Sequence, residues 1–221
     1  MRRFLVSLIM ISAAPLHAAE RTLHFSQPVG DLEAVTVEVG AGDVTVTGCD
    51  CNEITAQVTV TGKRWQLEDL DLEAQTTGKT LKLSLSPRKY SGKKAGEDWT
   101  LKLPRQLNLS VEAGVGDVRI RGMNGELEVQ LGVGDVVITE LVSNLVAETG
   151  VGDVEVRGSW TAVGRMRLNT GVGSVTAHTP QGKLSGHGIV SESLEDKGHG
   201  KASISIATGV GDITLILKED L

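Results

Sequence analysis

Apolar and polar residues alternate on both sides of a series of glycine-rich breaks. Leu127, Val129 and Leu131 alternate with polar residues before one such break, and Val136 and Ile138 do so after it. A period of two with one polar face is typical of half-buried β-strands and not of amphipathic helices. The pattern therefore predicts an all-β protein built from many short strands.

The glycine-rich breaks repeat at a fixed spacing. The motif Gly-Val-Gly-Asp-Val begins at Gly114, at Gly132 and at Gly150, so successive copies are 18 residues apart. Related copies begin at Gly40, Gly171 and Gly209, and a weaker copy spans 186–190. A fixed period of this kind indicates a chain in which each coil turns the same corner and stacks on the previous one. The sequence predicts a single-chain parallel β-solenoid, of the β-helix or β-roll type, with coils of about 18 residues.

The corner residues are expected to be structural. A sharp turn between strands often needs a positive φ, which glycine adopts without a steric penalty, and a following Asp can accept a hydrogen bond from a nearby N–H group. Six glycines are assigned to these turns: Gly114, Gly116, Gly132, Gly134, Gly150 and Gly152.

The N-terminal residues predict export. Arg2 and Arg3 precede an apolar run, 4–11, and Ala18 and Ala19 follow it. This order is typical of a secretory signal peptide over residues 1–19, and no other segment is long and apolar enough to cross a bilayer. We expect one solenoid domain over 20–221, with irregular coils over 20–113 and regular coils over 114–217, in the periplasm or cell envelope.

The net charge of the mature chain limits the kinds of molecule that it can bind. Without Arg2 and Arg3, the chain keeps 20 Lys and Arg against 28 Asp and Glu, a net charge of about −8. Nucleic acid and anionic lipid are poor partners for such a protein. The one basic run, Pro87–Lys94, is interpreted as a solvated loop. The expected partner is an envelope protein or polymer whose identity the residues do not specify.

Cys49 and Cys51 leave three alternatives open. An exported protein with an even number of cysteines is expected to form a disulfide, and the turn-forming residues Gly48, Asp50 and Asn52 would ease the strain of so short a ring. The alternatives are two free or intermolecular thiols, and a metal or redox site that would lack further ligands nearby.

No catalytic residue and no cofactor is predicted. None of the histidines expected in the mature chain lies in a nucleophile elbow or a zinc motif; they are His24, His178, His187 and His199. Outward positions stacked by the 18-residue period place no pair of carboxylates in register, as cleavage of polysaccharides would require. We expect a protein without enzymatic activity.

A column of aspartates is the candidate calcium site. If the coils stack in register, Asp117, Asp135 and Asp153 lie about 5 Å apart and repel one another unless they are hydrogen-bonded, protonated or bridged by a cation. Calcium, which prefers oxygen ligands, is the hypothesis considered for this column. Ser174 stands at the equivalent position of a later copy and is interpreted as an interruption.

The order of these motifs resembles a known bacterial family. Gly-Asp-Val, a turn with Asp50, Asn52 and Glu53, the segment Leu103–Leu109 and then the Gly-x-Gly-Asp-Val coils are similar to domain-of-unknown-function family 4097 (DUF4097), whose members are called putative adhesins. The resemblance implies a right-handed parallel solenoid, exported or envelope-associated, without assigned catalysis. We expect an adhesin-like binding or scaffold module. The alternative is a calcium-binding or polysaccharide-acting solenoid.

Overall fold

The protein is described from a computed structural model of the 221-residue chain. The structure describes residues 19–63, 67, 70–87, 96–186, 192–196 and 200–219. Residues 1–18 of the predicted signal peptide, residues 88–94 of the basic run and residues 187–190 of the weaker copy lie outside these ranges.

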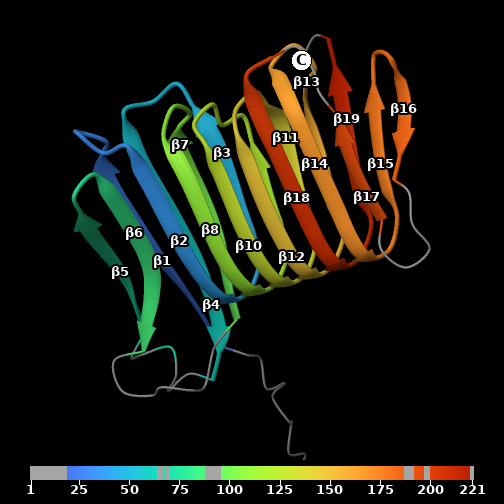
Figure 1. Ribbon diagram of the computed structural model, residues 1–221. Helices are drawn as coiled ribbons and strands as arrows, with labels where there is room; N and C mark the ends of the chain where they lie inside the picture. Colours follow the sequence, from blue (N-terminus) through green and yellow to red (C-terminus); the bar gives the residue numbers. More distant parts are fainter. Residues whose placement is uncertain are drawn as a thin grey trace, which may run out of the picture.

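The described chain forms two sheets that face each other (Figure 1). The first sheet has the order β1 (Ala19–Pro28), β4 (Glu53–Gly62), β7 (Gly96–Pro104), β3 (Val44–Cys49), β9 (Val118–Arg121), β11 (Val136–Leu141), β13 (Val154–Ser159), β19 (Ile213–Lys218), β15 (Val175–Thr179) and β16 (Gly182–Ser185). The second sheet has the order β17 (Glu192–Asp196), β14 (Val163–Val172), β18 (Ala202–Val210), β12 (Leu145–Val151), β10 (Leu127–Val133), β8 (Asn108–Val115), β2 (Ala34–Ala41), β6 (Thr80–Pro87) and β5 (Leu70–Thr77).

Strand register follows the sequence repeat. Leu127 pairs with Leu109 on one side and with Leu145 on the other, so both partners are 18 residues away. On the first sheet, Val136 pairs with Val118 and Val154 at the same spacing. All of these pairs are parallel. The predicted all-β, mainly parallel, solenoid-like architecture is confirmed.

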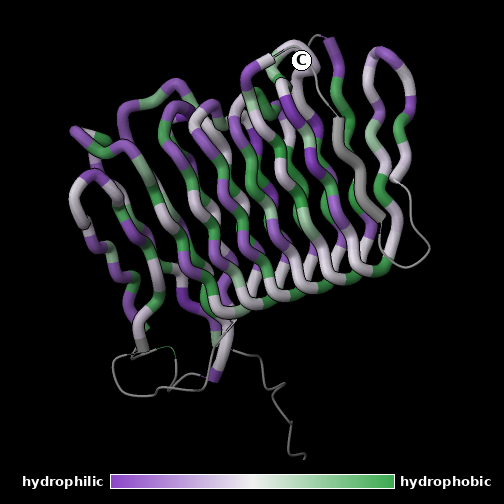
Figure 2. Tube along the Cα trace, in the orientation of Figure 1, coloured by the Kyte–Doolittle hydropathy of each residue, from purple (hydrophilic) through white to green (hydrophobic). Residues whose placement is uncertain are grey.

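The core lies between the two sheets and is almost entirely aliphatic. Along β10 and β12, buried and exposed residues alternate until the corner, and Figure 2 shows the same alternation of hydrophobic and hydrophilic residues along the strands. Trp99 and Trp160 are the aromatic side chains buried among the described residues. Each coil thus buries the alternate side chains that the pattern predicts.

The coils do not stack in the order of the sequence, and the prediction that each coil lies on the previous one is wrong at both ends. The last coil, β18 and β19, lies between the coil of β12 and β13 and the coil of β14 and β15. At the other end, β6 and β7 flank β2 and β3 on the outer side before the chain returns to β8 and β9. The coils share one motif and one strand register, so coils that are neighbours in space need not be neighbours in the sequence.

Antiparallel strands close the two ends. β1, β4 and β7 pair antiparallel, as do β5 and β6, and at the far end β16 and β17 pair antiparallel with β15 and β14. The guanidinium of Arg21, on edge strand β1, donates through Nη1 to the carbonyl oxygens of Leu67 and Leu70, both at 2.7 Å. An inward charge of this kind hinders the edge strand from pairing with another chain. Among the described residues, no helix is long and apolar enough to span a membrane.

Candidate functional site

The second glycine of each corner has a backbone that other residues adopt only with strain. Gly116, Gly134 and Gly152 have φ values of 130°, 137° and 143°. A Cβ added to Gly134 would lie 2.1 Å from the carbonyl oxygen of Gly116 in the next coil. Positive φ and close contact between coils therefore both require glycine at this position.

The first glycine is required by close packing of the backbone alone. Gly114, Gly132 and Gly150 have no positive φ, but a Cβ on Gly132 would lie 2.4 Å from the carbonyl oxygen of Gly114. The same contact recurs at 2.5 Å between Gly150 and Gly132. The turn chemistry inferred from the sequence accounts for the second glycine and not for the first.

The corner aspartates form a continuous ladder of hydrogen bonds between coils. The backbone N–H of Asp135 donates to Oδ1 of Asp117 at 3.1 Å, and the N–H of Asp153 donates to Oδ1 of Asp135 at 2.9 Å. The donor belongs to the neighbouring coil and not to the turn of the Asp itself. Each of these two carboxylates thereby accepts a hydrogen bond from the neighbouring coil.

The ladder of hydrogen bonds extends beyond the coils that carry the repeated Gly-Val-Gly-Asp-Val motif. It ends at Ser174. The N–H of Asp43 donates to Asp98 Oδ1, and at the far end Ser174 donates to Asp212 Oδ1 through its N–H at 2.7 Å and its hydroxyl at 3.0 Å. Among the described residues, the coil of Ser174 is the last parallel coil, so no further N–H of that part of the chain needs an acceptor there. The interpretation of Ser174 as an interruption is therefore wrong.

Sequence reasoning missed Asp98 because Glu97, and not a glycine, stands directly before it, so the Gly-x-Gly-Asp motif is absent. The available signal was the spacing Asp98, Trp99, Leu101, which matches Asp43, Val44, Val46. The register pairs Val44 with Trp99 and confirms that the two segments are equivalent in the sheet.

Arg119 stabilises the charge on two neighbouring aspartates. Its Nη2 lies 2.8 Å from Asp117 Oδ2, and its Nη1 lies 3.7 Å from Asp43 Oδ2. The hydrogen bond from the Asp135 N–H and the Arg119 guanidinium lower the pKa of Asp117, and partial burial opposes this effect. Asp117 therefore stays ionised to lower pH than an isolated aspartate.

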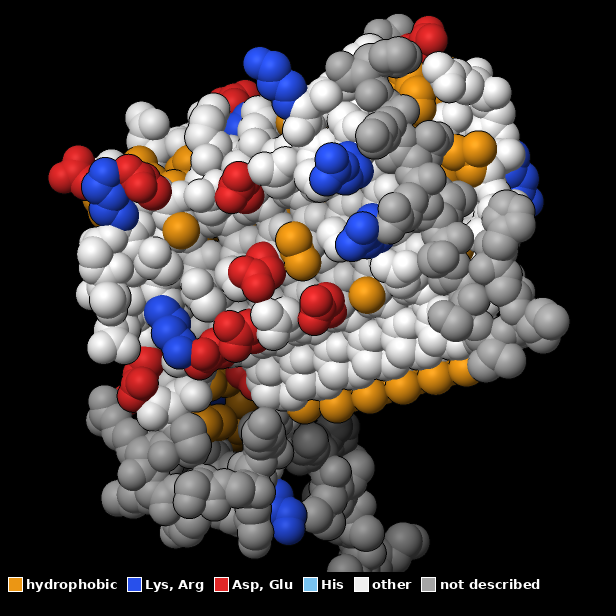
Figure 3. Space-filling view, viewed as in Figure 1, with side chains coloured by type: hydrophobic (Ala, Val, Ile, Leu, Met, Phe, Trp, Pro, Cys, Tyr) orange, Lys and Arg blue, Asp and Glu red, His pale blue; other side chains and the backbone are white. Residues whose placement is uncertain are grey.

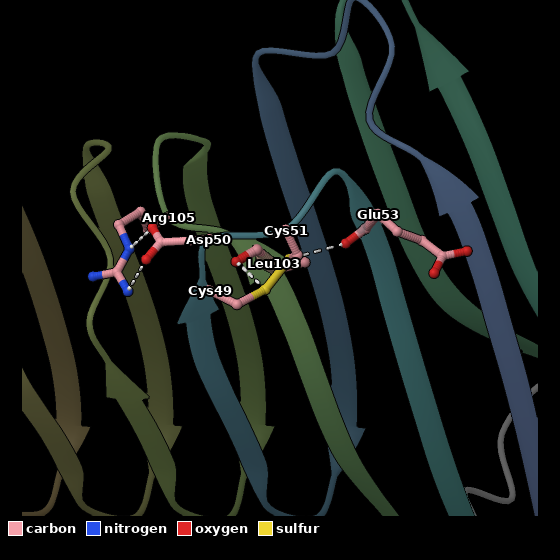
Figure 4. The surroundings of a disulfide bond; sticks show 6 residues. All are labelled: Cys49, Asp50, Cys51, Glu53, Leu103 and Arg105. Atoms are coloured by element: carbon pink, nitrogen blue, oxygen red, sulfur yellow. Dashed lines mark hydrogen bonds and ion pairs between the residues drawn. A yellow bond between two sulfur atoms is a disulfide. The ribbon is translucent and has the colours of Figure 1, made fainter.

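The structure joins Cys49 and Cys51 in a disulfide across the turn after β3 (Figure 4). Sγ of Cys49 lies 3.3 Å from the carbonyl oxygen of Leu103, and the intervening Asp50 pairs with Arg105, whose Nε is 2.7 Å from Asp50 Oδ1. The ion pair links this turn to the residue after β7, and the disulfide closes the turn itself. The described residues contain no free cysteine.

A groove of about 1060 Å³ crosses the outward face of the second sheet at the corners. Its floor includes Gly40, Gly114, Gly132, Gly150 and Gly209, which follow one another from coil to coil. Because these positions carry no side chain, the floor is backbone. The space-filling view shows this pale strip with acidic side chains on one side and a row of hydrophobic side chains along the other (Figure 3).

The hydrophobic row is a ridge of exposed valines. Each follows the first glycine of a corner, and each is about half exposed: Val115, Val133, Val151, Val210 and Val172, at 52%, 47%, 47%, 47% and 54%. On the opposite side of the groove lie Glu38, Glu112, Gln130 and Glu148. We call these two rows the valine ridge and the carboxylate row.

The described residues bring together no group of three or more His, Cys, Asp and Glu that could hold a metal ion. His24 lies in β1 and His178 in β15, in strands that do not pair with each other, while His187 and His199 lie outside the described ranges. The groove and its two rows are therefore the candidate site that the structure adds to the sequence.

One solved structure shows that the fold occurs in another bacterial protein. A crystal structure of a putative cell adhesion protein from Clostridium sporogenes matches with a TM-score of 0.65 and 18% sequence identity, over 90% of this chain and 100% of that chain. Putative adhesins from Bacteroides fragilis and Parabacteroides merdae match with TM-scores of 0.36 and 0.30 and identities of 14% and 10%. They cover 88% and 90% of this chain and 96% and 97% of their own. No curated protein is similar enough in sequence to count as a relative.

One family model matches the sequence, that of the N-terminal domain of toast_rack, DUF2154, over residues 31–141. This is not the DUF4097 model, so membership of DUF4097 stays a prediction. The matched residues run from the loop before β2 to the end of β11 and make up half of the chain. By this match, the protein belongs to the family described as the N-terminal domain of toast_rack, DUF2154.

Proposed function

We propose that this protein is an exported, non-enzymatic solenoid that acts as an adhesin-like binding or scaffold module in the periplasm or cell envelope. The observation that carries the proposal is the valine ridge beside the glycine-floored groove. The predicted signal peptide supports the location, and right-handed winding of the coils is part of the same proposal.

The valine ridge has no evident role in folding. Its side chains point outward and keep about half of their surface in water, whereas the valines of the same coils that point inward, such as Val136 and Val154, are fully buried. Neighbouring strands are about 4.8 Å apart, so five consecutive coils make an apolar strip about 19 Å long. Contiguous exposed apolar surface next to a groove is typical of an interaction site.

The repetition of the site favours binding over catalysis. A catalytic centre needs a local set of unlike groups in one fixed geometry. The groove instead presents nearly the same floor and the same ridge in each coil, with Gly132 and Val133 followed by Gly150 and Val151. Such a surface suits a partner that is itself extended.

The proposal is tested by crosslinking in the envelope of the native cell. A photoreactive residue replaces Val133 on the ridge, and a matched variant carries the same residue at Glu20, which is exposed on β1 of the other sheet. We expect Val133 to capture a specific envelope component, identified by mass spectrometry, and Glu20 not to capture it. Equal capture by both positions, or none by either, contradicts the proposal.

A further inference from the structure

We infer that the groove binds an extended, basic segment of polypeptide in which Lys or Arg alternates with aliphatic residues. This inference rests on the proposed function, because it names the chemistry of the partner at the same site. Three features of the groove support it: uncompensated charge, apolar surface and a floor without side chains.

Most carboxylates on the carboxylate side of the groove have no ion-pair partner among the described residues. Glu38 pairs with Lys82, but no ion pair is found for Glu112, Glu128 or Glu148 among the described residues. Gln130, which the register places between Glu112 and Glu148, donates to Glu128 at 3.0 Å and brings no charge. Carboxylates on neighbouring strands repel one another, and a cationic partner converts this repulsion into attraction.

The opposite side of the groove is apolar. The valine ridge runs parallel to the carboxylate row, since Gln130, Gly132 and Val133 follow one another in one strand and their counterparts pair in register across the sheet. A small polyamine would meet the carboxylates and leave the valines in water. A partner that satisfies both sides must therefore carry both positive and aliphatic groups.

An extended polypeptide has this two-sided character. Its successive side chains point to opposite sides, so alternating Lys and Val directs the charges to one side and the aliphatic groups to the other. The glycine floor lets the backbone of the bound segment approach closely. From β2 to β18 the floor spans five strands, about 19 Å, which accommodates about six extended residues.

A second copy of this chain is a poorer occupant. If the valine ridge of one copy entered the groove of another in a symmetric pair, the carboxylate row of each copy would face the corner of its partner. The corners carry the aspartate ladder, with Asp135 and Asp153 each two residues after a ridge valine. Acidic rows would then lie against acidic corners, which disfavours this pairing.

The experiment measures binding of three fluorescein-labelled octapeptides to the purified mature protein by fluorescence anisotropy. The probe alternates Lys and Val, and its two controls alternate Glu and Val, and Lys and Ser. We expect only the Lys and Val peptide to bind, and its affinity to fall as salt is raised.

Two outward double variants test the two sides of the groove. Glu112→Gln with Glu148→Gln removes the charge, and Val133→Thr with Val151→Thr keeps the β-branched shape while adding a hydroxyl. Each is expected to weaken binding about tenfold. The control, Glu20→Gln, removes one carboxylate charge from the first sheet and leaves the affinity unchanged. Thermal unfolding checks that all variants are folded.

Each other outcome overturns the inference. Equal binding of the Lys and Ser peptide shows simple charge attraction, and binding of the Glu and Val peptide excludes a basic partner. Concentration-dependent dimerisation that the Val133→Thr and Val151→Thr variant abolishes identifies a second copy as the occupant. If no peptide binds while position 133 still captures an envelope component, the basic-polypeptide inference fails and the proposed function stands. If both experiments fail, both proposals are wrong.

Discussion

The backbone N–H of Asp135 donates a hydrogen bond to Oδ1 of Asp117 in the neighbouring coil, at 3.1 Å. The corner carboxylate thus links two coils and does not merely close its own turn. This bond also lowers the pKa of Asp117. Stability of the solenoid should therefore depend on the ionisation of the corner.

Replacement of Asp117 tests this dependence. We expect Asp117→Ala to lower the free energy of unfolding by about 2 kcal/mol near neutral pH, because the N–H of Asp135 loses a charged acceptor. Asp117→Asn keeps an acceptor oxygen but loses the charge that faces Arg119, so we expect a smaller loss of about 1 kcal/mol.

The pH dependence has a defined sign. The pKa of Asp117 is lower in the folded protein than in the unfolded chain. The stabilisation is therefore complete above the unfolded pKa, at about pH 4, and is lost as the pH falls through the folded pKa. Denaturant unfolding of wild type and Asp117→Asn between pH 7 and pH 2, a range of about 5 units, should show the two free energies converging at low pH. A constant difference over this range contradicts the assignment.

The two reasons for glycine at the corner, its positive φ and the close approach of the neighbouring coil, can be tested separately. Gly134 and Gly182 have nearly equal φ values, 137° and 135°, but a Cβ on Gly182 meets nothing within 4 Å. We expect Gly182→Ala to cost about 1–3 kcal/mol from backbone strain alone. Gly134→Ala should cost roughly 1–3 kcal/mol more, because its Cβ meets the carbonyl oxygen of Gly116. Thermal or denaturant unfolding measures the difference, and equal losses would show that the coils separate easily at the corner.

A buried hydroxyl offers a stabilising change. Thr208 donates through Oγ1 to the carbonyl oxygen of Gly152 at 3.1 Å, whereas the buried Oγ1 of Thr149, in the neighbouring strand, has no hydrogen-bond partner among the described residues. We expect Thr149→Val to raise the free energy of unfolding by about 1 kcal/mol, since valine has the same shape without an unpaired polar group. The matched variant Thr208→Val should lower it by a similar amount. The prediction is wrong if both variants change stability in the same direction.

The disulfide should contribute little to stability. Cys49 and Cys51 are two positions apart, so their bond closes a loop of three residues. In the chain-entropy model, so short a loop restrains the unfolded chain by only about 1.6 kcal/mol. Replacing both cysteines with Ser should lower the free energy of unfolding by about this amount, measured by denaturant titration with the reduced wild type as control. A loss above about 4 kcal/mol would mean that the bond holds the native turn itself.

The sequence predicts the repeating part of the fold well, because one repeated motif specifies the corner, the alternation of buried and exposed residues and the 18-residue register. The order of the coils could not be predicted, since the copies at Gly171 and Gly209 carry equivalent patterns and either fits beside Gly150. Ser174 was the one signal for this order. An Asp is needed at the corner only where the next coil supplies an N–H donor, so a Ser there marks the end of the stack. The groove was missed because its floor glycines look like turn residues, and Glu112 and Glu148 look like ordinary solvated positions until the register places them in one row.

Calcium should not stabilise the protein if the ladder is the reason for the corner aspartates. In Asp43, Asp117, Asp135, Asp153 and Asp212, Oδ1 accepts a backbone N–H from the neighbouring coil, which offsets the repulsion in the column without a metal ion. We therefore expect the melting temperature to stay unchanged when calcium is added or a chelator is present. Asp117→Asn serves as the control. A calcium-dependent rise in the melting temperature of wild type that this variant loses would show that the column binds the ion. The ladder alone would then not explain the regular spacing of the carboxylates along the repeat.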